Sequence, residues 1–374
     1  MNPASSCRTT MNDDTTIDNT AADDTTTTAN AADDVTLSWR RSLFSALGYH
    51  LYTIYLFTYS SHKDVIYPGL VFSLSTALSS RSYLPLSSSP SPLEIIPRTP
   101  YALLQIYLSL LLFSLHNQHH PSSILEDTIN KPWRPLPAGR ISPSQTRLLL
   151  ILGVYPLFFG TAYTLGTLFP TISFVIFTIY YCELGGCSAG GVARGLLNAL
   201  GYSCFFTGGF LALVGNSQTP TTHHSQYTQS QFTRYFKHTQ QGGPGTGTVW
   251  QWLVVICAVV FTTTHTQDFR DEKGDLARGR KTVQTTLGDA GARWVVVVAS
   301  AAWSVVIPNM FGLGLIVSAT LCGGAGVLAY FLLSGIKNRT VEGDIRVYKV
   351  WIAWFMAVIL SPLIQTGLDL CFSK

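Results

Sequence analysis

The chain has 374 residues, of which 47% are apolar and only 12% are charged, and its mean hydropathy is +0.26. Soluble domains carry about 25% charged residues, so the composition excludes an ordinary soluble protein. Apolar runs long enough to cross a bilayer recur along the sequence, which predicts an all-α, polytopic membrane protein. The net charge of +4 reflects an excess of basic residues in loops, which indicates orientation and anionic partners rather than nucleic acid. The seven cysteines include no Cys-x-x-Cys pair, which argues against a disulfide framework or a zinc site.

The N-terminal part of the chain is polar. Residues 1–36 are mostly Thr, Asp, Asn and Ala and predict a disordered acidic tail. They show no basic segment followed by an apolar core, so we expect no cleaved signal peptide. The next segment, 37–62, contains an aromatic stretch at 39–59 that fits either an additional spanning helix or an amphipathic helix in the membrane interface. The remaining residues, 63–374, are expected to form one transmembrane domain.

This domain contains nine candidate spans. They lie at about 65–80, 99–116, 146–164, 167–183, 193–214, 249–266, 291–308, 311–334 and 346–367. With nine spans, the loops at 117–145, 184–192, 267–290 and 335–345 share one side of the membrane. That side holds fifteen Lys and Arg residues and the opposite loops hold four, so the positive-inside rule predicts that the first set of loops faces the cytosol.

One of these loops carries an acidic cluster. Its members are Asp268, Asp271 and Asp275, whose spacing of i, i+3 and i+7 points all three carboxylates the same way on a helix. Like charges on one face repel unless a cation lies between them, and Mg²⁺ binds carboxylates together with substrate phosphates. Three basic residues follow: Arg278, Arg280 and Lys281. The simplest ligand is therefore a diphosphate. The alternative is a solvated, charged loop, which the scarcity of acidic residues elsewhere in the chain disfavours.

A second loop on the same side also combines acidic and basic residues. It contains Glu126 and Asp127, followed by Lys131 and Arg134, directly after a predicted span. Acidic residues at membrane depth are costly, which favours a functional interpretation. Two such loops facing one compartment predict a bipartite metal–diphosphate site over a cavity in the helical bundle.

The two loops carry the motifs Asp127-x-x-Asn-Lys-Pro-Trp-Arg-Pro-x-Pro-x-Gly and Asp268-x-x-Asp-x-x-Gly-Asp-x-x-x-Gly-Arg-x-Thr. This pair resembles the motifs of the UbiA superfamily of intramembrane prenyltransferases, over nearly all of residues 63–367. The resemblance implies a ring of nine transmembrane helices around a central cavity that the acidic motifs cap. The reduced first motif, with Glu-Asp before Asn-Lys-Pro-Trp-Arg-Pro, is similar to fungal members, some of which act as membrane-bound class I terpene cyclases.

The first motif departs from the family pattern Asn-Asp-x-x-Asp-x-x-x-Asp. If its last Asp is Asp127, then His119, His120 and Ser123 stand where the family has Asn and the first two Asp. Alternatively, an insertion makes Asn117 the equivalent Asn, and Glu126 substitutes for a lost carboxylate. On either alignment the two histidines are interpreted as loop residues.

The hypothesis assigns residues to three roles. Mg²⁺ is held by Glu126, Asp127, Asp268, Asp271 and Asp275, with the four aspartates also catalytic. The diphosphate is bound by Asn117, Lys131, Arg134, Arg278, Arg280 and Lys281. The cavity wall includes Asn198, which alternatively links two helices, and Tyr202, with Tyr180, Tyr181, Phe205, Phe206 and Trp252 as further aromatic candidates. Glu183 is interpreted as an interface residue and His265 as a packing residue.

Three functions remain open. A terpene cyclase needs one prenyl diphosphate, with farnesyl diphosphate and a sesquiterpene product favoured by the resemblance. A prenyltransferase needs in addition a site for an aromatic or other small acceptor. A transporter or scaffold gives no reason for two acid–base loops on one side. We expect the lipid bilayer and the substrate as partners, no obligate protein partner, and location in the endoplasmic reticulum.

Overall fold

The computed structural model describes residues 44–84, 90–215 and 248–372, and within these ranges it contains helices and loops but no strand. The predicted acidic tail at 1–36 lies outside the described residues. Of the described residues, those up to Tyr52 belong to one compact unit and those from Thr53 onward belong to another. Residues 44–58 are helical, a length that does not distinguish a spanning helix from an interfacial one, so both interpretations of the 37–62 segment stay predictions.

The second unit is a helical bundle, in which η marks short 3₁₀ or π-helical turns. Its elements are η1 (Tyr59–Ser61), η2 (His62–Ile66), α2 (Tyr67–Leu78), η3 (Ser79–Arg81), α3 (Pro92–Ile95), η4 (Ile96–Arg98), α4 (Thr99–Gln118), α5 (Pro121–Asn130), α6 (Pro143–Leu148), η5 (Leu149–Val154), α7 (Tyr155–Leu165), α8 (Leu168–Cys182), η6 (Gly186–Ser188), α9 (Gly191–Val214), α11 (Val249–Thr263), η8 (Thr264–Gln267), α12 (Asp268–Ala277), α13 (Val283–Phe311), α14 (Leu315–Lys337) and α15 (Val341–Phe372).

Each of the nine predicted spans overlaps a helix of this bundle. Seven continuous helical segments of the described chain are long and apolar enough to cross a membrane, which makes the chain an integral membrane protein. The other two helices, α2 and α8, have 12 and 15 residues and are shorter than the roughly 20 residues that a spanning helix needs. The all-α membrane bundle is thus confirmed, whereas the number of nine spans stays a prediction.

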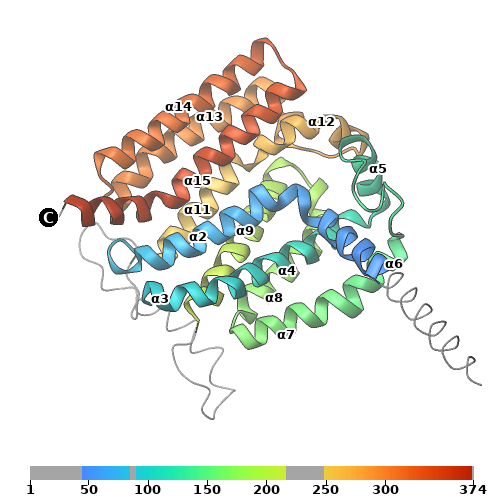
Figure 1. Ribbon diagram of the computed structural model, residues 1–374. Helices are drawn as coiled ribbons and strands as arrows, with labels where there is room; N and C mark the ends of the chain where they lie inside the picture. Colours follow the sequence, from blue (N-terminus) through green and yellow to red (C-terminus); the bar gives the residue numbers. More distant parts are fainter. Residues whose placement is uncertain (1–43, 85–89, 216–247, 373–374) are drawn as a thin grey trace, which may run out of the picture. The chain divides into compact units, whose positions relative to one another are not determined.

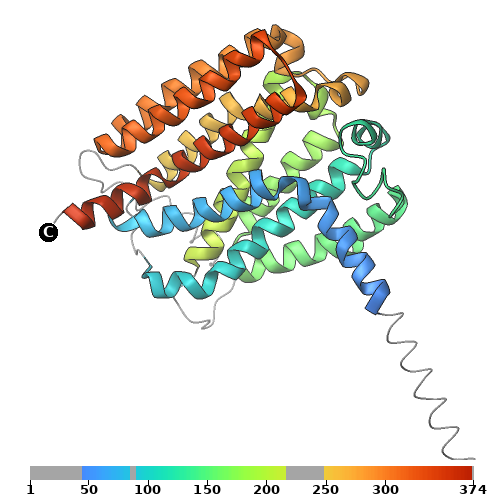
Figure 2. The same ribbon diagram turned by 45° about the horizontal axis from the view of Figure 1, so that its top comes forward.

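Helix α9 lies at the centre of the packing. It contacts α2, α4, α8 and α11 (Figure 1), and its second half is almost entirely buried. Helices α13, α14 and α15 pack side by side, as both views show (Figure 2), and α15 returns against α2. Many large apolar side chains remain exposed on the outer helices, for example Val298, Leu315 and Tyr330, as expected for a surface that faces lipid.

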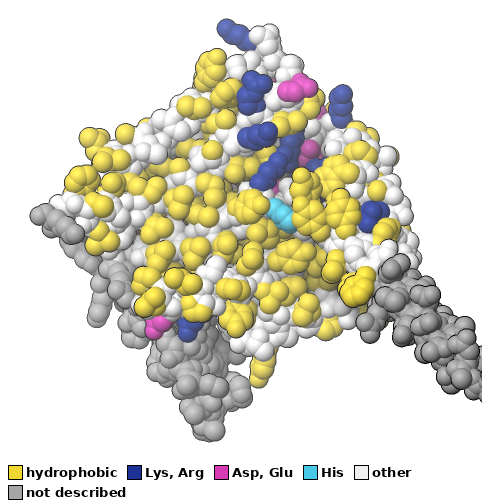
Figure 3. All heavy atoms as spheres, viewed as in Figure 1, with side chains coloured by type: hydrophobic (Ala, Val, Ile, Leu, Met, Phe, Trp, Pro, Cys, Tyr) yellow, Lys and Arg dark blue, Asp and Glu magenta, His cyan; other side chains and the backbone are white. Residues whose placement is uncertain are grey.

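The four loops predicted to share one side lie at one end of the bundle. Arg278 on the α12–α13 turn is 3.3 Å from Cys187 Sγ in the α8–α9 connection, and Arg339 between α14 and α15 is 2.8 Å from Glu272 on α12. Figure 3 shows charged side chains gathered at this end, while most of the visible face is hydrophobic. These contacts bring the loops together, while their position on the cytosolic side of a membrane stays a prediction.

The turn between α12 and α13 places the basic residues of this end. Gly279 adopts φ 71°, a left-handed conformation that a side chain disfavours, and reverses the chain after α12. Thr282 then caps α13, where its hydroxyl accepts a hydrogen bond from the Thr285 backbone, the usual role of Thr at this position. After this turn Arg280 returns to Asp275 of α12 at 2.7 Å, while Arg278, before the turn, reaches Glu126 of α5 at 2.9 Å.

Candidate active site

Helices α5 and α12 lie side by side, although about 140 residues separate them along the chain. Asn130 at the end of α5 donates a hydrogen bond of 2.9 Å to the carbonyl oxygen of Asp271. Lys131 Nζ lies 3.0 Å from Asp271 Oδ2, and Arg278 Nη1 lies 2.9 Å from Glu126 Oε2. The structure therefore brings together the two acid–base loops that the sequence predicts to meet.

The cations that separate the clustered carboxylates are protein side chains. Arg194 at the start of α9 lies 3.0 Å from Asp268 and 3.8 Å from Asp275. Arg280 contacts both Asp275, at 2.7 Å, and Glu126, at 3.0 Å. These two arginines offset the repulsion among the clustered carboxylates. They also join α5, α9 and α12 into one network.

The remaining carboxylates have their own partners. Arg134 Nη1 donates to both oxygens of Asp127, at 2.8 and 2.9 Å, a strong charge-assisted arrangement. Burial raises the pKa of Glu126, but the guanidinium groups of Arg280 and Arg278 outweigh this effect and hold the pKa below its ordinary value. Glu126 is therefore ionised at neutral pH. Together these acidic and basic side chains form what we call the charged mouth: Glu126, Asp127, Lys131, Arg134, Arg194, Asp268, Arg270, Asp271, Asp275, Arg278 and Arg280.

A cavity lies directly inside the charged mouth. Its inner wall is mostly apolar and aromatic and comes from α4, α8 and α9. These wall residues are Leu110, Phe113, Asn117, Phe174, Phe177, Thr178, Tyr181, Leu197, Asn198, Gly201, Tyr202 and Phe205. Binding pockets for small molecules commonly combine such an apolar wall with a few placed polar groups. The shape fits a ligand with a charged head and an apolar chain.

Most of the predicted site residues lie at this cavity. Those that line it are Asn117, Glu126, Lys131, Arg134, Asn198, Tyr202, Asp271 and Arg280. Asp127, Asp268, Asp275 and Arg278 lie behind the lining and are held in its ion pairs. Lys281, by contrast, is exposed and is not part of the lining. The roles of all these residues stay predictions.

Some of the aromatic candidates line the cavity and others do not. Tyr181, Tyr202 and Phe205 line the cavity, whereas Tyr180 is 54% exposed and Phe206 and Trp252 are packed in the core. His265 lies 3.1 Å from the carbonyl oxygen of Ala292, as expected for a packing residue. Asn117 lines the cavity and His119 and His120 do not, an arrangement that favours the alignment in which Asn117 is the motif's asparagine.

Three further charged residues of the lining were not predicted as site residues: Asp64, Arg194 and Arg270. Arg194 precedes an apolar run and Arg270 lies within the acidic cluster, and both belong to the basic residues that indicate orientation. Asp64 lies on η2, next to Lys63, in a stretch without other acidic residues. It is 7% exposed and lines the cavity. An acidic residue directly before an apolar span was the available signal.

Asp64 belongs to a small network with two residues from other helices. Tyr348 on α15 donates a hydrogen bond to Asp64 Oδ2, and the Arg270 guanidinium lies 3.8 Å from the centre of the Tyr348 ring. Asp64 Oδ1 is buried and has no hydrogen-bond partner. Burial raises the pKa of Asp64, although the Tyr348 hydrogen bond and Arg270 act against it.

The donor set of the charged mouth fits Mg²⁺. Asp268 Oδ1 and Asp275 Oδ2 are buried and face Arg194, at 3.0 and 3.8 Å, so a metal ion would bind them in place of this arginine. All the acidic groups here offer carboxylate oxygens, the ligands that Mg²⁺ prefers. Basic residues stand between and beside them, as recognition of a phosphate group requires.

Comparisons with known proteins bear on the family and the fold. The model of the UbiA prenyltransferase family matches residues 102–363. The chain is 29% identical to fumagillin beta-trans-bergamotene synthase of Aspergillus fumigatus, over 84% of the chain and 92% of that protein. It is 24% identical to a polyprenyl transferase of Hericium erinaceus, over 87% of the chain and 99% of that protein. Among solved structures, a UbiA homolog from Aeropyrum pernix superimposes with a TM-score of 0.52 at 15% identity, over 80% of the chain and 96% of that structure.

Proposed function

Because the chain belongs to the UbiA prenyltransferase family, we propose that it is a membrane-bound class I terpene cyclase. In this proposal it ionises a prenyl diphosphate, cyclises the resulting cation and releases diphosphate. The observation that carries the proposal is a cavity that is charged at its mouth and aromatic inside. Similarity to a bergamotene synthase supports the same reaction class. Farnesyl diphosphate as substrate and a sesquiterpene as product rest on the family resemblance alone.

The charged mouth binds the diphosphate head. Lys131, Arg134 and Arg280 line the cavity and present cationic donors to the phosphate oxygens, which favours charge on the departing group. Mg²⁺, when bound by Glu126, Asp127, Asp268, Asp271 and Asp275, would supply further neutralisation of the leaving group. The allylic carbon–oxygen bond breaks, and its electron pair leaves with the pyrophosphate.

The inner wall controls the cation that remains. It excludes water, so that a double bond of the same chain rather than a water molecule attacks the cation. Tyr181, Tyr202 and Phe205 present aromatic faces, each of which stabilises a nearby cation by about 0.5–2 kcal/mol. A proton leaves at the end of the cascade, and the product is a cyclic hydrocarbon.

A prenyltransferase is the second candidate, and Asp64 is the observation that favours it. A transferase needs a group that takes a proton from the acceptor, and Asp64 offers a buried carboxylate oxygen without a hydrogen-bond partner at the cavity. Similarity to a polyprenyl transferase supports this candidate. Both candidates use the same charged mouth.

One assay separates these functions. Microsomes that contain the full chain are incubated with farnesyl or geranylgeranyl diphosphate and Mg²⁺, without an acceptor. A hydrocarbon in the headspace supports the cyclase, and a product that forms only after an aromatic acceptor is added supports the transferase. If neither forms, both proposals fail.

We also propose that the charged mouth faces the cytosol from the endoplasmic reticulum membrane, as the distribution of basic residues favours.

A further inference from the structure

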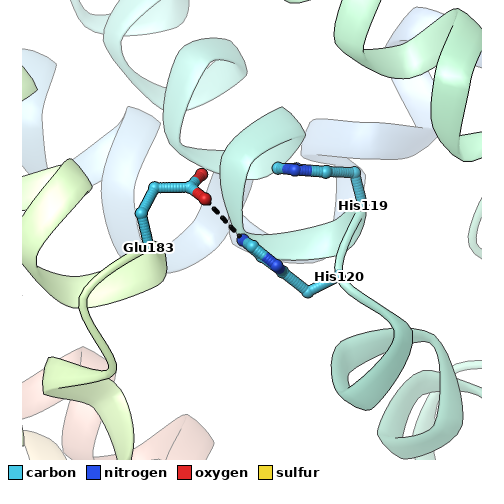
Figure 4. Close-up of side chains that lie close together, drawn as sticks. All are labelled: His119, His120 and Glu183. Atoms are coloured by element: carbon cyan, nitrogen blue, oxygen red, sulfur yellow. Dashed lines mark ion pairs between the residues drawn. The ribbon is translucent and has the colours of Figure 1, made fainter.

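A second group of metal-binding side chains lies near the charged mouth but outside its cavity. It consists of His119, His120 and Glu183 (Figure 4). The two histidines form the joint between α4 and α5, and Glu183 directly follows α8. None of the three lines the cavity. Figure 4 shows both imidazole rings and the carboxylate facing one another from these separate elements.

The distances among the three groups suit a single ion. One ligand atom from each residue lies within 4.8 Å of the other two, and His120 Nε2 is 3.1 Å from Glu183 Oε2. Ligands that surround a tetrahedral zinc ion at about 2.0 Å are about 3.3 Å apart. The His120–Glu183 edge already has about this length, and the two edges to His119, which are at most 4.8 Å, would shorten when an ion binds.

The surrounding hydrogen bonds orient His119 for coordination. His119 Nδ1 lies 3.0 Å from the carbonyl oxygen of Leu115. Because a carbonyl only accepts, Nδ1 carries the proton and Nε2 carries the free electron pair. Histidines that bind metal ions are held in this way, with the second ring nitrogen donating to a carbonyl or carboxylate.

Glu183 is oriented by a chain of polar groups. His116 Nδ1 donates to Glu183 Oε1 at 2.6 Å, and His116 Nε2 accepts from the Tyr155 hydroxyl at 2.8 Å. This chain anchors one carboxylate oxygen and leaves Oε2 facing His120. His120 Nε2 is also buried, and it forms an ion pair with this oxygen at 3.1 Å. A bound cation would take the place of this direct contact and hold both atoms as ligands.

We propose that His119, His120 and Glu183 bind one divalent transition metal ion, such as zinc, at a site separate from the diphosphate cavity. Two imidazoles and one carboxylate form a donor set found in zinc sites, and imidazole favours zinc and its neighbours over Mg²⁺. The cysteine pattern does not bear on this site, because none of its ligands is a cysteine.

The ion has a structural consequence that does not depend on the proposed reaction. It ties the α4–α5 joint to the end of α8. Helix α5 carries Glu126 and Asp127, and its first turn presents Ser123 to Arg278 at 2.9 Å. A metal ion at the joint therefore fixes the orientation of α5 relative to the bundle. We expect zinc to raise the melting temperature of the protein.

The test measures metal content and affinity rather than turnover. The full chain, purified in detergent with an affinity tag that contains no histidine, is dialysed against limiting Zn²⁺ in excess Mg²⁺. Elemental analysis is expected to find one zinc ion per chain, and Co²⁺ in its place is expected to give visible d–d absorption. Competition with a chromophoric chelator then measures the zinc affinity.

Variants locate the ion. His119→Ala, His120→Ala and Glu183→Gln are expected to weaken zinc binding by at least about 100-fold, since even a lost orienting partner costs roughly 10- to 100-fold. His50→Ala, which removes an exposed histidine outside the cluster, and Asp271→Asn should retain the ion. If an alanine variant fails to fold, Glu183→Gln decides, because the amide oxygen still accepts from His116. Absence of zinc from the wild type, its displacement by Mg²⁺, or its retention by Glu183→Gln overturns the proposal.

Discussion

Asp271 is the residue through which the two acid–base loops are joined, since it contacts Lys131 with its side chain and Asn130 with its carbonyl oxygen. We expect Asp271→Asn to reduce turnover of the prenyl diphosphate by about 100-fold or more, because it removes a charge from the group that stabilises the leaving diphosphate. Asp127→Ala should have the same effect on turnover. Product formation in microsomes measures both.

The adjacent Glu272 provides a matched control for Asp271. It lies on the same turn of α12 but contacts Arg339 at 2.8 Å, outside the cavity lining. Glu272→Gln should therefore leave turnover near the wild-type value while expression of both variants stays normal. Retained turnover in Asp271→Asn would contradict the site.

Asp64 makes a pH-dependent contribution to stability. Burial raises its pKa in the folded protein above the ordinary value, so the folded state holds its proton more tightly than the unfolded state. The free energy of unfolding therefore falls as the pH rises from the ordinary aspartate pKa to the raised pKa of the folded state. At pH values above the folded-state pKa it stays at the lower level. We expect Asp64→Asn, which keeps an oxygen acceptor for Tyr348, to raise the melting temperature at pH 8 and to change it little at pH 4. A difference that is equal at both pH values would contradict this assignment.

At the scale of elements, the close approach of α5 and α12 depends on a glycine. A Cβ atom at Gly274 would lie 2.2 Å from Asn130 Nδ2, the atom that donates to Asp271. Alanine normally favours a helix by about 1 kcal/mol over glycine, but here the side chain of Asn130 has to move. We expect Gly274→Ala to lower turnover by about 10- to 100-fold, the effect of misplacing a catalytic group by about 1 Å.

Two further variants test whether the clash is the cause. Asn130→Ala added to Gly274→Ala removes the obstructing atoms and should restore part of the lost turnover. Gly326→Ala on α14, where no atom lies within 4 Å of the added carbon, should leave turnover unchanged. If Gly326→Ala is as harmful as Gly274→Ala, the contact between α5 and α12 is not responsible.

Helix positions were predictable from the sequence because a residue that faces either lipid or the bundle core is apolar, so each helix appears as a continuous apolar stretch. The direction in which a given residue points was not predictable in the same way. Tyr180 and Tyr181 are neighbours of equal chemistry, yet only Tyr181 lines the cavity. That difference is set by the rotation of α8 against its neighbours, which an apolar stretch does not encode.

At the scale of the whole molecule, the meeting of the two acid–base loops followed from charge distribution, because basic residues on one side reveal which loops share a compartment. The individual ion pairs, however, could not be predicted from the charge distribution. Arg194 stands alone before an apolar run, and its partners Asp268 and Asp275 become apparent only when α9 is placed against α12. Lys281 is adjacent to Arg280 in sequence, but Lys281 is exposed, whereas Arg280 is buried in ion pairs with Glu126 and Asp275.

These ion pairs predict how the molecule binds its ligands. Every acidic side chain of the charged mouth has a basic partner within it. Mg²⁺ alone would take carboxylates from their partners and leave buried guanidinium groups unpaired, and pyrophosphate alone would leave buried carboxylates unpaired. An unpaired buried charge is strongly destabilising. When both ligands bind, each broken pair is replaced by a new one.

We therefore expect Mg²⁺ and pyrophosphate to bind with positive cooperativity. Each alone should shift the melting temperature little, and together they should shift it by clearly more than the sum of the separate shifts, because ligands that bind only the folded state stabilise it. The same coupling should appear in calorimetry as a pyrophosphate affinity that rises with Mg²⁺ concentration, reciprocally for the two ligands. In Asp271→Asn the coupling should weaken, since one exchanged pair is missing, while Glu272→Gln should preserve it. Additive shifts in the wild-type protein would show that the ion pairs of the charged mouth are not exchanged when the ligands bind.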